Sequence, residues 1–201
     1  MRRRHLVIMV KAPQAGRVKT RLAAAIGTVE ALRCYRVLLA GTVRRLASDG
    51  RWVTWLAVTP DRAARQTAAW ARGIGPVAVV PQGPGGLGER MQRLMDQLPP
   101  GPVVIVGSDI PGVGRRDIAA AFRALGADDA VFGPAEDGGY WLVGQRRTPR
   151  TLRLFDAVRW SSEHTLSDTL RNVEGLKVAH LRTIADVDDE AAYLLWRRGN
   201  G

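Results

Sequence analysis

The sequence predicts an α/β fold in which a mostly parallel central sheet is covered by helices on both faces. Two observations lead to this prediction. Short apolar runs of strand length alternate along the chain with longer segments whose apolar residues recur at helical spacing. One of these runs, 103–106, consists of four β-branched residues in succession, which is typical of a parallel strand buried on both faces.

The size and composition of the chain indicate a globular protein. It has 201 residues, of which 46% are apolar and 24% charged, so we expect one domain spanning residues 1–201. No segment reaches the roughly 18 apolar residues that a membrane span needs. The apolar run 6–10 is too short for a signal peptide, and we therefore expect a cytoplasmic protein. The single cysteine, Cys34, excludes an internal disulfide and is interpreted as a core residue.

The formal net charge of +11 makes a polyanion a candidate partner. However, the cations are spread along the chain, and the aromatic residues, 6% of the total, do not alternate with them as on a base-stacking surface. Nucleic acid is therefore not favoured. Only three of the 30 cationic residues are lysine, and two of these, Lys11 and Lys19, follow the first expected strand closely. A compact ammonium differs from a guanidinium in how it binds phosphate, so this pair points to chemistry in that segment.

The expected elements follow one another in a regular order. Strands are expected at 5–10, 52–59, 77–80, 103–106, 130–134 and 177–181. Helices are expected at 28–48, 60–70, 91–98, 115–125 and 191–197, with a further helix capped by Ser161 or Ser162.

The segment after the first strand, 11–22, is rich in cations. It contains Lys11, Arg17, Lys19 and Arg21, together with Gly16. This pattern predicts a phosphate cradle formed by Lys11, Gly16, Lys19 and Arg21, with a solvated basic loop as the alternative. Val18 stands where a P-loop requires glycine, which excludes a P-loop NTPase.

Ser108 and Asp109 directly follow the central strand and precede a Pro111-Gly112 turn. The carboxyl ends of parallel strands are where open α/β sheets bind ligands. The pair therefore indicates metal or phosphate chemistry, although Asp109 could also serve only as a turn cap.

The segment 135–144 combines acids, glycines and aromatics. Glu136 and Asp137 can orient hydroxyls or a metal, Gly138 and Gly139 let the backbone bend beside a ligand, and Tyr140 can wall a pocket. A tight hairpin with Tyr140 or Trp141 in the core is the alternative.

Two further segments suggest ligand contacts. Gly83-x-Gly85-x-x-Gly88 formally matches a dinucleotide fingerprint, but it lies far from the first βα unit, where that motif belongs. Its glycines are interpreted as letting backbone approach some ligand. The acidic run 186–190 precedes the last expected helix. It could supply a second metal carboxylate, or it could simply favour the start of the helix.

Taken together, five motifs occur in a familiar order: Lys11-Ala-Pro-x-x-Gly-x-x-Lys-Thr-Arg-Leu22, Leu87-Gly-Glu-Arg-Met91, Gly107-Ser-Asp-Ile-Pro111, Gly133-Pro-Ala-Glu-Asp-Gly-Gly-Tyr-Trp-Leu142 and Trp160-Ser161. The set resembles the small GT-A-fold glycosyltransferase-like, or radical-SAM/selenodomain-associated, transferases. That family is related to phospholactate guanylyltransferase and to the molybdenum-cofactor nucleotidyltransferases. The resemblance covers nearly the whole chain.

The resemblance implies a nucleotide-diphospho-sugar-transferase fold with a divalent metal ion, Mg²⁺ or Mn²⁺. Asp109 would bind the metal, with Asp188 as the best match for a second ligand and Asp186 as the alternative. The residues expected to bind nucleotide and phosphate are Lys11, Gly16, Lys19, Arg21, Gly88, Arg90 and Ser108. Family members tend to carry Asp where this chain has Gly86, which leaves the nucleobase preference open.

The leading hypothesis is a metal-dependent nucleotidyltransferase. Lys19, Arg21 and Asp109 would act on a nucleoside triphosphate, releasing pyrophosphate. A small phosphorylated or hydroxyl acceptor would bind at Glu136, Asp137, Gly138, Gly139 and Tyr140. Glycosyl transfer from a nucleotide sugar is the alternative, and a non-catalytic nucleotide- or nucleic-acid-binding protein is a second one. A dinucleotide oxidoreductase, binding its cofactor at 83–88, is a further class to test.

Overall fold

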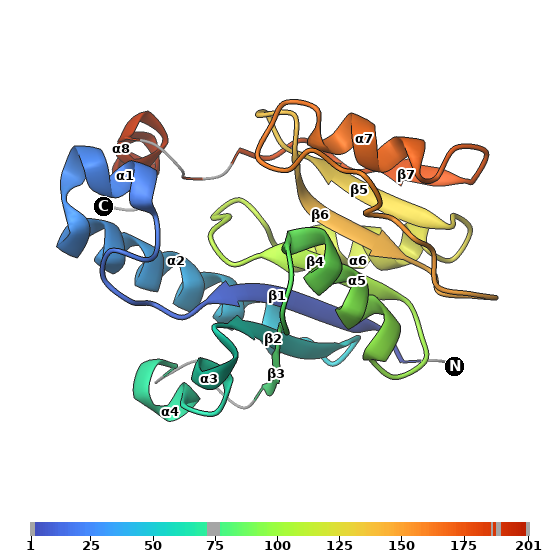
Figure 1. Ribbon diagram of the computed structural model, residues 1–201, viewed down its shortest axis with the longest axis horizontal. Helices are drawn as coiled ribbons and strands as arrows, with labels where there is room; N and C mark the ends of the chain where they lie inside the picture. Colours follow the sequence, from blue (N-terminus) through green and yellow to red (C-terminus); the bar gives the residue numbers. More distant parts are fainter. Residues whose placement is uncertain (1–2, 72–76, 186, 188–189, 200–201) are drawn as a thin grey trace.

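The computed structural model describes residues 3–71, 77–185, 187 and 190–199. Within these ranges one seven-stranded sheet has the strand order β3-β2-β1-β4-β6-β5-β7 (Figure 1). Only β6 runs antiparallel to its neighbours, so the prediction of a mostly parallel sheet is confirmed. The strands are β1 His5–Lys11, β2 Val53–Thr59, β3 Ala78–Pro81, β4 Val103–Gly107, β5 Ala130–Pro134, β6 Tyr140–Gln145 and β7 Val178–His180.

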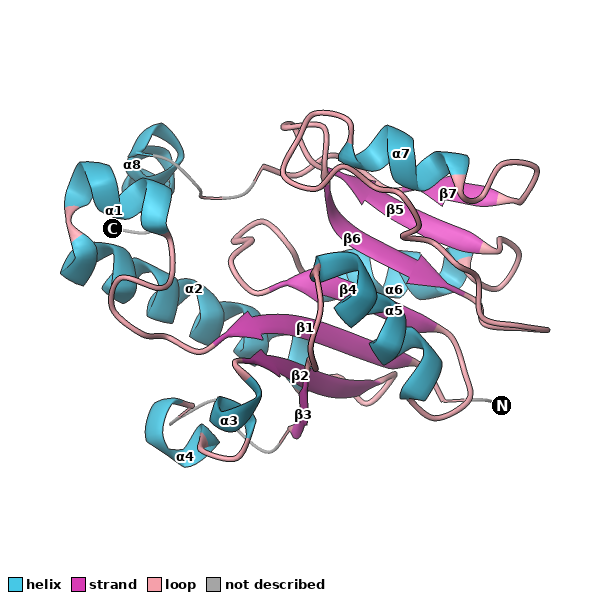
Figure 2. Ribbon diagram, viewed as in Figure 1, coloured by secondary structure: helices cyan, strands magenta, loops and turns pink. Residues whose placement is uncertain are grey.

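Helices cover both faces of this sheet (Figure 2). Helices α2 and α6 pack on one face and α5 packs on the other, and each face of the sheet has its own apolar core cluster. A third cluster joins α1, α2 and α8, which Figure 1 shows together on one side of the molecule. The helices are α1 Thr20–Ile26, α2 Thr28–Ala47, α3 Asp61–Ala64, α4 Thr67–Trp70, α5 Leu87–Gln97, α6 Arg115–Ala124, α7 Thr165–Arg171 and α8 Glu190–Gly199. None of the described helices is long and apolar enough to cross a membrane.

The two central strands, β1 and β4, are buried on both faces. In β4, Val104 and Val106 face the α2 and α6 side, whereas Val103 and Ile105 face α5. All four side chains are at most 2% exposed. Because β1 and β4 are parallel neighbours, their carboxyl ends meet at one edge of the sheet. The loops that follow the two strands therefore begin side by side.

Strand β6 is not among the strands expected from the sequence. Of the two interpretations of the segment 135–144, a site loop or a tight hairpin with Tyr140 or Trp141 in the core, the hairpin forms: Tyr140–Gln145 is a strand paired with both β4 and β5, and Trp141 is buried. The connection from β5 is a short turn in which Ala135 N–H donates to Gly139 O at 3.0 Å and Gly138 has φ +81°. So short a connection forces an antiparallel hairpin. The amino end of β6 therefore lies at the same sheet edge as the carboxyl ends of β1 and β4.

Three helix predictions need correction. The expected helix 60–70 is two short helices, α3 and α4. Helix α5 begins at Leu87 rather than residue 91, because the Glu89 carboxylate accepts the Gly86 N–H at 2.7 Å and caps it. The helix expected to be capped by Ser161 or Ser162 begins only at Thr165. Ser161 has φ +55°, which is not the extended conformation that an N-cap residue takes.

Cys34 is the core residue that the sequence predicted. It lies in α2, in the cluster shared with α1 and α8, and is 3% exposed. Burial raises the pKa of its thiol to about 11. The thiol is therefore protonated at neutral pH and is a poor nucleophile.

Gly133 in β5 provides a test of how tightly the sheet is packed. A Cβ there would lie 2.3–2.7 Å from the indole of Trp141, which is itself 4% exposed. We expect Gly133→Ala to lower the free energy of unfolding by about 1–3 kcal/mol through overpacking. Urea denaturation measures the change. Gly50→Ala is the control, because a Cβ at Gly50 would meet nothing within 4 Å; equal effects of the two substitutions would contradict the packing explanation.

Candidate functional site

A cavity of about 480 Å³ opens at the carboxyl ends of β1 and β4. The loop after β1, the start of α1, the loop after β4 and helix α5 all contribute to its walls. It gathers most of the residues predicted to bind nucleotide and phosphate, namely Lys11, Lys19, Arg21, Arg90 and Ser108, together with the predicted metal ligand Asp109. Arg17 joins them, so that five cationic side chains line the cavity.

An ion pair between Lys19 and Asp109 links two of these loops. The Lys19 Nζ lies 2.6 Å from Asp109 Oδ2, and the side chains are 3% and 29% exposed respectively. Lys19 has φ +48°, a left-handed conformation that costs a non-glycine residue about 1–2 kcal/mol. The neighbouring Val18, only 5% exposed, is anchored in the core. The buried valine explains why this loop does not have the glycine of a P-loop.

Tyr35 in α2 contacts both the loop after β1 and the loop after β4. It is not among the predicted site residues. Its hydroxyl donates to Lys11 O at 2.7 Å, accepts the Lys11 N–H at 3.1 Å and lies 3.2 Å from Ser108 Oγ. The side chain is 3% exposed. Burial raises the pKa of Tyr35 to about 12, so the phenol stays neutral at physiological pH. Its position among the apolar residues of α2 resembles that of an ordinary core residue, and no local signal marks its role.

Arg90 projects into the cavity from α5. One of its terminal nitrogens, Nη1, donates to Thr59 Oγ1 at 3.3 Å. Its Nε is buried and has no hydrogen-bond partner in the described part of the chain. A guanidinium has five N–H donors, so most of the hydrogen-bonding capacity of Arg90 remains for an anion in the cavity.

A second cavity, of about 250 Å³, adjoins the first and shares Met9, Leu87, Gly107 and Asp109 with it. Asp109 is therefore the carboxylate common to both. The predicted residues Asp137, Gly139 and Tyr140 line this second cavity, as do Trp141 and the unpredicted Trp160, Ser161, Ser162 and Thr165. Its lining contains no lysine or arginine among the described residues.

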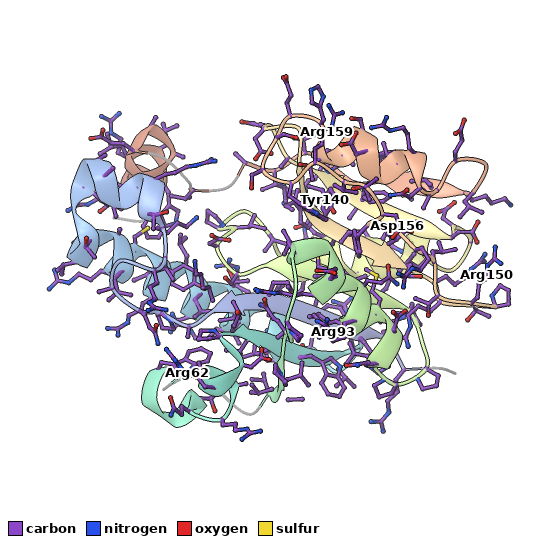
Figure 3. The ribbon with its side chains drawn as sticks, in the orientation of Figure 1. Arg62, Arg93, Tyr140, Arg150, Asp156 and Arg159 are labelled. Carbon is purple, nitrogen blue, oxygen red and sulfur yellow. The ribbon has the colours of Figure 1, made fainter. Side chains whose placement is uncertain are left out.

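The walls of the second cavity come mainly from the β5–β6 hairpin and the segment before α7. Tyr140, at the start of β6, lies beside the segment that carries Arg159 (Figure 3), and its ring meets Trp160 edge-on at 6.5 Å. Burial raises the pKa of the Tyr140 phenol above its usual range. Asp137, exposed at the rim, accepts the Gly139 N–H at 2.9 Å, which fixes the carboxylate.

The serine segment owes its shape to hydrogen bonds rather than to a helix cap. Ser162 Oγ and Thr165 Oγ1 both donate to Arg159 O, at 2.9 and 2.8 Å. The Arg159 guanidinium in turn binds the Asp168 carboxylate, which is 1% exposed. These contacts join residues three to nine positions apart, and they hold the segment whose Ser161 and Ser162 line the cavity.

Several predicted site residues line neither cavity. Gly16 forms a turn at φ +72°, and Glu136 is exposed. Gly88 packs against Trp160, because a Cβ there would lie 2.8 Å from the indole. Gly138 lies against the backbone of Glu163, where a Cβ at position 138 would clash. Asp188 and Asp186, the two candidates for a second metal ligand, lie outside the described residues.

Asp109 is suited to bind a divalent cation whose other ligands come from the phosphates of a bound substrate. In the part of the chain that the structure describes, no three His, Cys, Asp or Glu residues are grouped so that they could hold a metal ion. Mg²⁺, however, is usually bound by one or two carboxylates together with substrate phosphates. A single carboxylate next to a cation-lined cavity fits that arrangement, and Lys19 Nζ already shows that a positive charge is favoured at Asp109.

We expect Tyr35→Phe to destabilise the loops above it. The change removes the acceptor of the Lys11 N–H and the donor to Lys11 O, so the free energy of unfolding should fall by about 1–3 kcal/mol. Hydrogen exchange at the Lys11 amide should accelerate. Tyr193→Phe is the matched control, because the Tyr193 hydroxyl binds Glu30 instead. Unchanged protection of the Lys11 amide in Tyr35→Phe would contradict the role given to the hydroxyl.

Comparison with known proteins places this fold among transferases. No curated protein matches the sequence at a significant level. A candidate nucleotide-diphospho-sugar transferase from Desulfovibrio desulfuricans G20 is 30% identical, with a TM-score of 0.88 over 100% of this chain and 88% of that one. The predicted fold, that of the GT-A nucleotide-diphospho-sugar transferases, is thus confirmed.

Two more distant solved structures share the fold. The 4-diphosphocytidyl-2C-methyl-D-erythritol synthase from Anaerococcus prevotii DSM 20548 is 9% identical, with a TM-score of 0.66, covering 98% of this chain and 96% of that one. Glucosyl-3-phosphoglycerate synthase from Mycobacterium tuberculosis, solved with Mn²⁺, UDP and glucosyl-3-phosphoglycerate, is 11% identical, with a TM-score of 0.57, covering 92% and 71%. Finally, residues 42–162 match the model of a family described as an uncharacterized protein conserved in bacteria (DUF2064), and the chain belongs to that family.

Proposed function

We propose that the protein is a metal-dependent nucleotidyltransferase that moves a nucleotidyl group from a nucleoside triphosphate to a hydroxyl acceptor. The observation that carries this proposal is the unequal charge of two adjoining cavities that share Asp109. The first is lined by five cations, whereas the lining of the second, over the described residues, contains no cation and only two carboxylates, Asp109 and Asp137. The first suits a triphosphate, and the second suits a group without phosphate.

In this proposal the first cavity binds the donor. Lys11, Arg17, Lys19, Arg21 and Arg90 surround the phosphates and offset the charge that develops as pyrophosphate leaves. Lys19 leaves its partner Asp109 to contact the phosphates. Asp109 is the residue that would hold Mg²⁺ or Mn²⁺, and the ion would supply positive charge to stabilise the negative charge that develops on the phosphates. The Mn²⁺ in the distant glucosyl-3-phosphoglycerate synthase structure supports a divalent ion in this fold.

The second cavity binds the acceptor, and Asp137 is placed to act on it. The acceptor hydroxyl attacks the α-phosphorus, the bond from that phosphorus to the β-phosphate bridging oxygen breaks, and pyrophosphate departs. The hydroxyl proton passes to the Asp137 carboxylate, whose orientation the Gly139 N–H fixes. Tyr140 and Trp160 offer aromatic surface to the apolar part of the acceptor. No covalent intermediate on the protein is needed.

Glycosyl transfer from a nucleotide sugar is the second candidate, and one observation favours it. The second cavity combines aromatic walls with a carboxylate at its rim, which also suits a sugar ring with its hydroxyls. The two reactions differ in what they release: pyrophosphate in the first, a nucleoside diphosphate in the second. Incubation with nucleoside triphosphates or nucleotide sugars, Mg²⁺ or Mn²⁺, and a panel of alcohols and sugars separates them. Nucleoside diphosphate release without pyrophosphate would overturn the leading proposal.

We expect Asp109→Asn to abolish the metal-dependent rise in melting temperature that a nucleotide produces. The substitution removes the charge that would hold the cation while keeping a side chain of the same size, so the ligand-free protein should still fold. A thermal-shift panel of nucleoside triphosphates and nucleotide sugars with Mg²⁺ or Mn²⁺ measures this. Asp156→Asn, an exposed residue outside both cavities, is the control. If Asp109→Asn responds like the unmodified protein, Asp109 is not the metal ligand.

We expect Asp137→Asn to lower kcat by about 10²–10⁴-fold, because an amide cannot take the acceptor proton. Nucleotide binding in the first cavity should be unchanged. Pyrophosphate release with the best acceptor of the panel provides the rate, and the thermal shift with nucleotide alone provides the binding. Glu136→Gln is the matched control, since Glu136 is exposed and lines neither cavity. Equal losses in the two variants would rule out a specific role for Asp137.

A further inference from the structure

A third hollow, of about 740 Å³, lies on the surface between α2, α6 and the loop that joins β4 to α6. It shares no lining residue with either cavity of the candidate site. Five of its eight lining residues are arginine, and one is acidic. The lining consists of Arg44, Arg45, Gly112, Gly114, Arg115, Arg116, Asp117 and Arg182.

The positive charge of this hollow is poorly compensated by the protein. Among the described residues, Arg182 alone of the five arginines forms a salt bridge, with Asp117 at 2.8 Å. Asp117 uses its other oxygen, Oδ2, to accept the Gly114 N–H at 2.8 Å. The other four guanidinium groups form no salt bridge with a described carboxylate, and only Arg115 has a further carboxylate near it, since its charge helps to lower the pKa of Asp49. A cleft lined by one sign of charge concentrates the field and attracts counter-ions.

Neutral oxygens hold these arginines in place despite their mutual repulsion. Arg45 donates to Val113 O at 3.1 Å and to Thr42 Oγ1 at 3.2 Å. Arg115 donates to Arg45 O at 2.7 Å and to Ser48 Oγ. Burial, followed by the charge of Arg44, lowers the pKa of Arg45. Bonds to carbonyl and hydroxyl oxygens orient a guanidinium but leave its charge uncancelled.

The chemistry of the lining narrows the class of ligand. Guanidinium groups pair with phosphate through two parallel hydrogen bonds, and four guanidinium groups that form no salt bridge match an anion with more than one phosphate charge. None of the described lining residues is aromatic, so the hollow offers no aromatic ring on which bases could stack. This favours a small oligophosphate over a single-stranded nucleic acid.

We propose that this arginine hollow is a binding site for a small oligophosphate anion, separate from the nucleotide cavity. Its wall includes Gly112 and Gly114 of the loop that follows Asp109. Arg182 donates to Gly112 O at 2.8 Å, so the anion would bind next to the backbone that carries the candidate metal ligand. The proposal does not depend on the reaction assigned to the other two cavities.

The test is calorimetric titration of the protein with inorganic pyrophosphate in the presence of EDTA. The variant is R44A/R116A, which removes two exposed arginines from the hollow. The matched control is R36A/R123A, which removes two exposed arginines from the same two helices, α2 and α6, outside the hollow. Both variants lower the net charge equally, and circular dichroism checks that both fold.

We expect R44A/R116A to weaken one pyrophosphate-binding event by about tenfold or more, because each lost charge-assisted hydrogen bond is worth about one order of magnitude in affinity. R36A/R123A should bind as the unmodified protein does. A second event that survives in R44A/R116A belongs to the nucleotide cavity, so the two sites are scored separately. Absence of binding, equal binding in all three proteins, or equal weakening in both variants would overturn the proposal.

Discussion

The structure depends on two central strands that are buried along most of their length. Strands β1 and β4 are neighbours, and α2, α6 and α5 cover them on both faces, so that their middle residues are apolar and buried. A charged side chain along these strands would have to be buried without water, at a large cost in free energy. Polar chemistry is therefore confined to the strand ends, where Lys19 and Asp109 form their ion pair.

That ion pair and the Tyr35 hydroxyl fix the geometry of the strand ends. Lys19 and Asp109 are ninety positions apart in the sequence, and Tyr35 lies 73 positions from Ser108. These contacts hold the loop after β1 against the loop after β4 in a conformation that leaves Lys19 at positive φ. The two loops are thus held together before any ligand arrives, and in the proposed reaction nucleotide binding exchanges the Lys19–Asp109 ion pair for contacts between Lys19 and phosphate.

The reversed strand β6 completes the site in a way that a fully parallel sheet would not. Because the β5–β6 connection is a tight turn, Asp137 and Tyr140 meet the loop of Asp109 at one sheet edge. The result is a cavity lined by cations on one side of Asp109 and, over the residues that the structure describes, a cavity lined by none on the other. This separation of charge supports a division between a phosphate-bearing donor and an acceptor without phosphate.

The sequence by itself determined most of the elements and the residue types at the strand ends. Apolar runs and helical spacing are local properties, and they predicted the parallel strands, α2, α6 and α8 within a few residues. Lys19 stood out as one of three lysines, in a segment rich in cations, Asp109 because it closely follows a buried strand, and Asp137 because it lies among acids, glycines and aromatics.

Only the tertiary structure decided the pairing of β6, the role of Tyr35, the position of Ser161 and Ser162 at a cavity, and the gathering of arginines from α2, α6 and the segment after β7. In an arginine-rich chain, no local pattern distinguishes a solvated guanidinium from one that shares a hollow with four others. Such arrangements rest on contacts between residues tens of positions apart, and those contacts exist only once the sheet has brought the segments together.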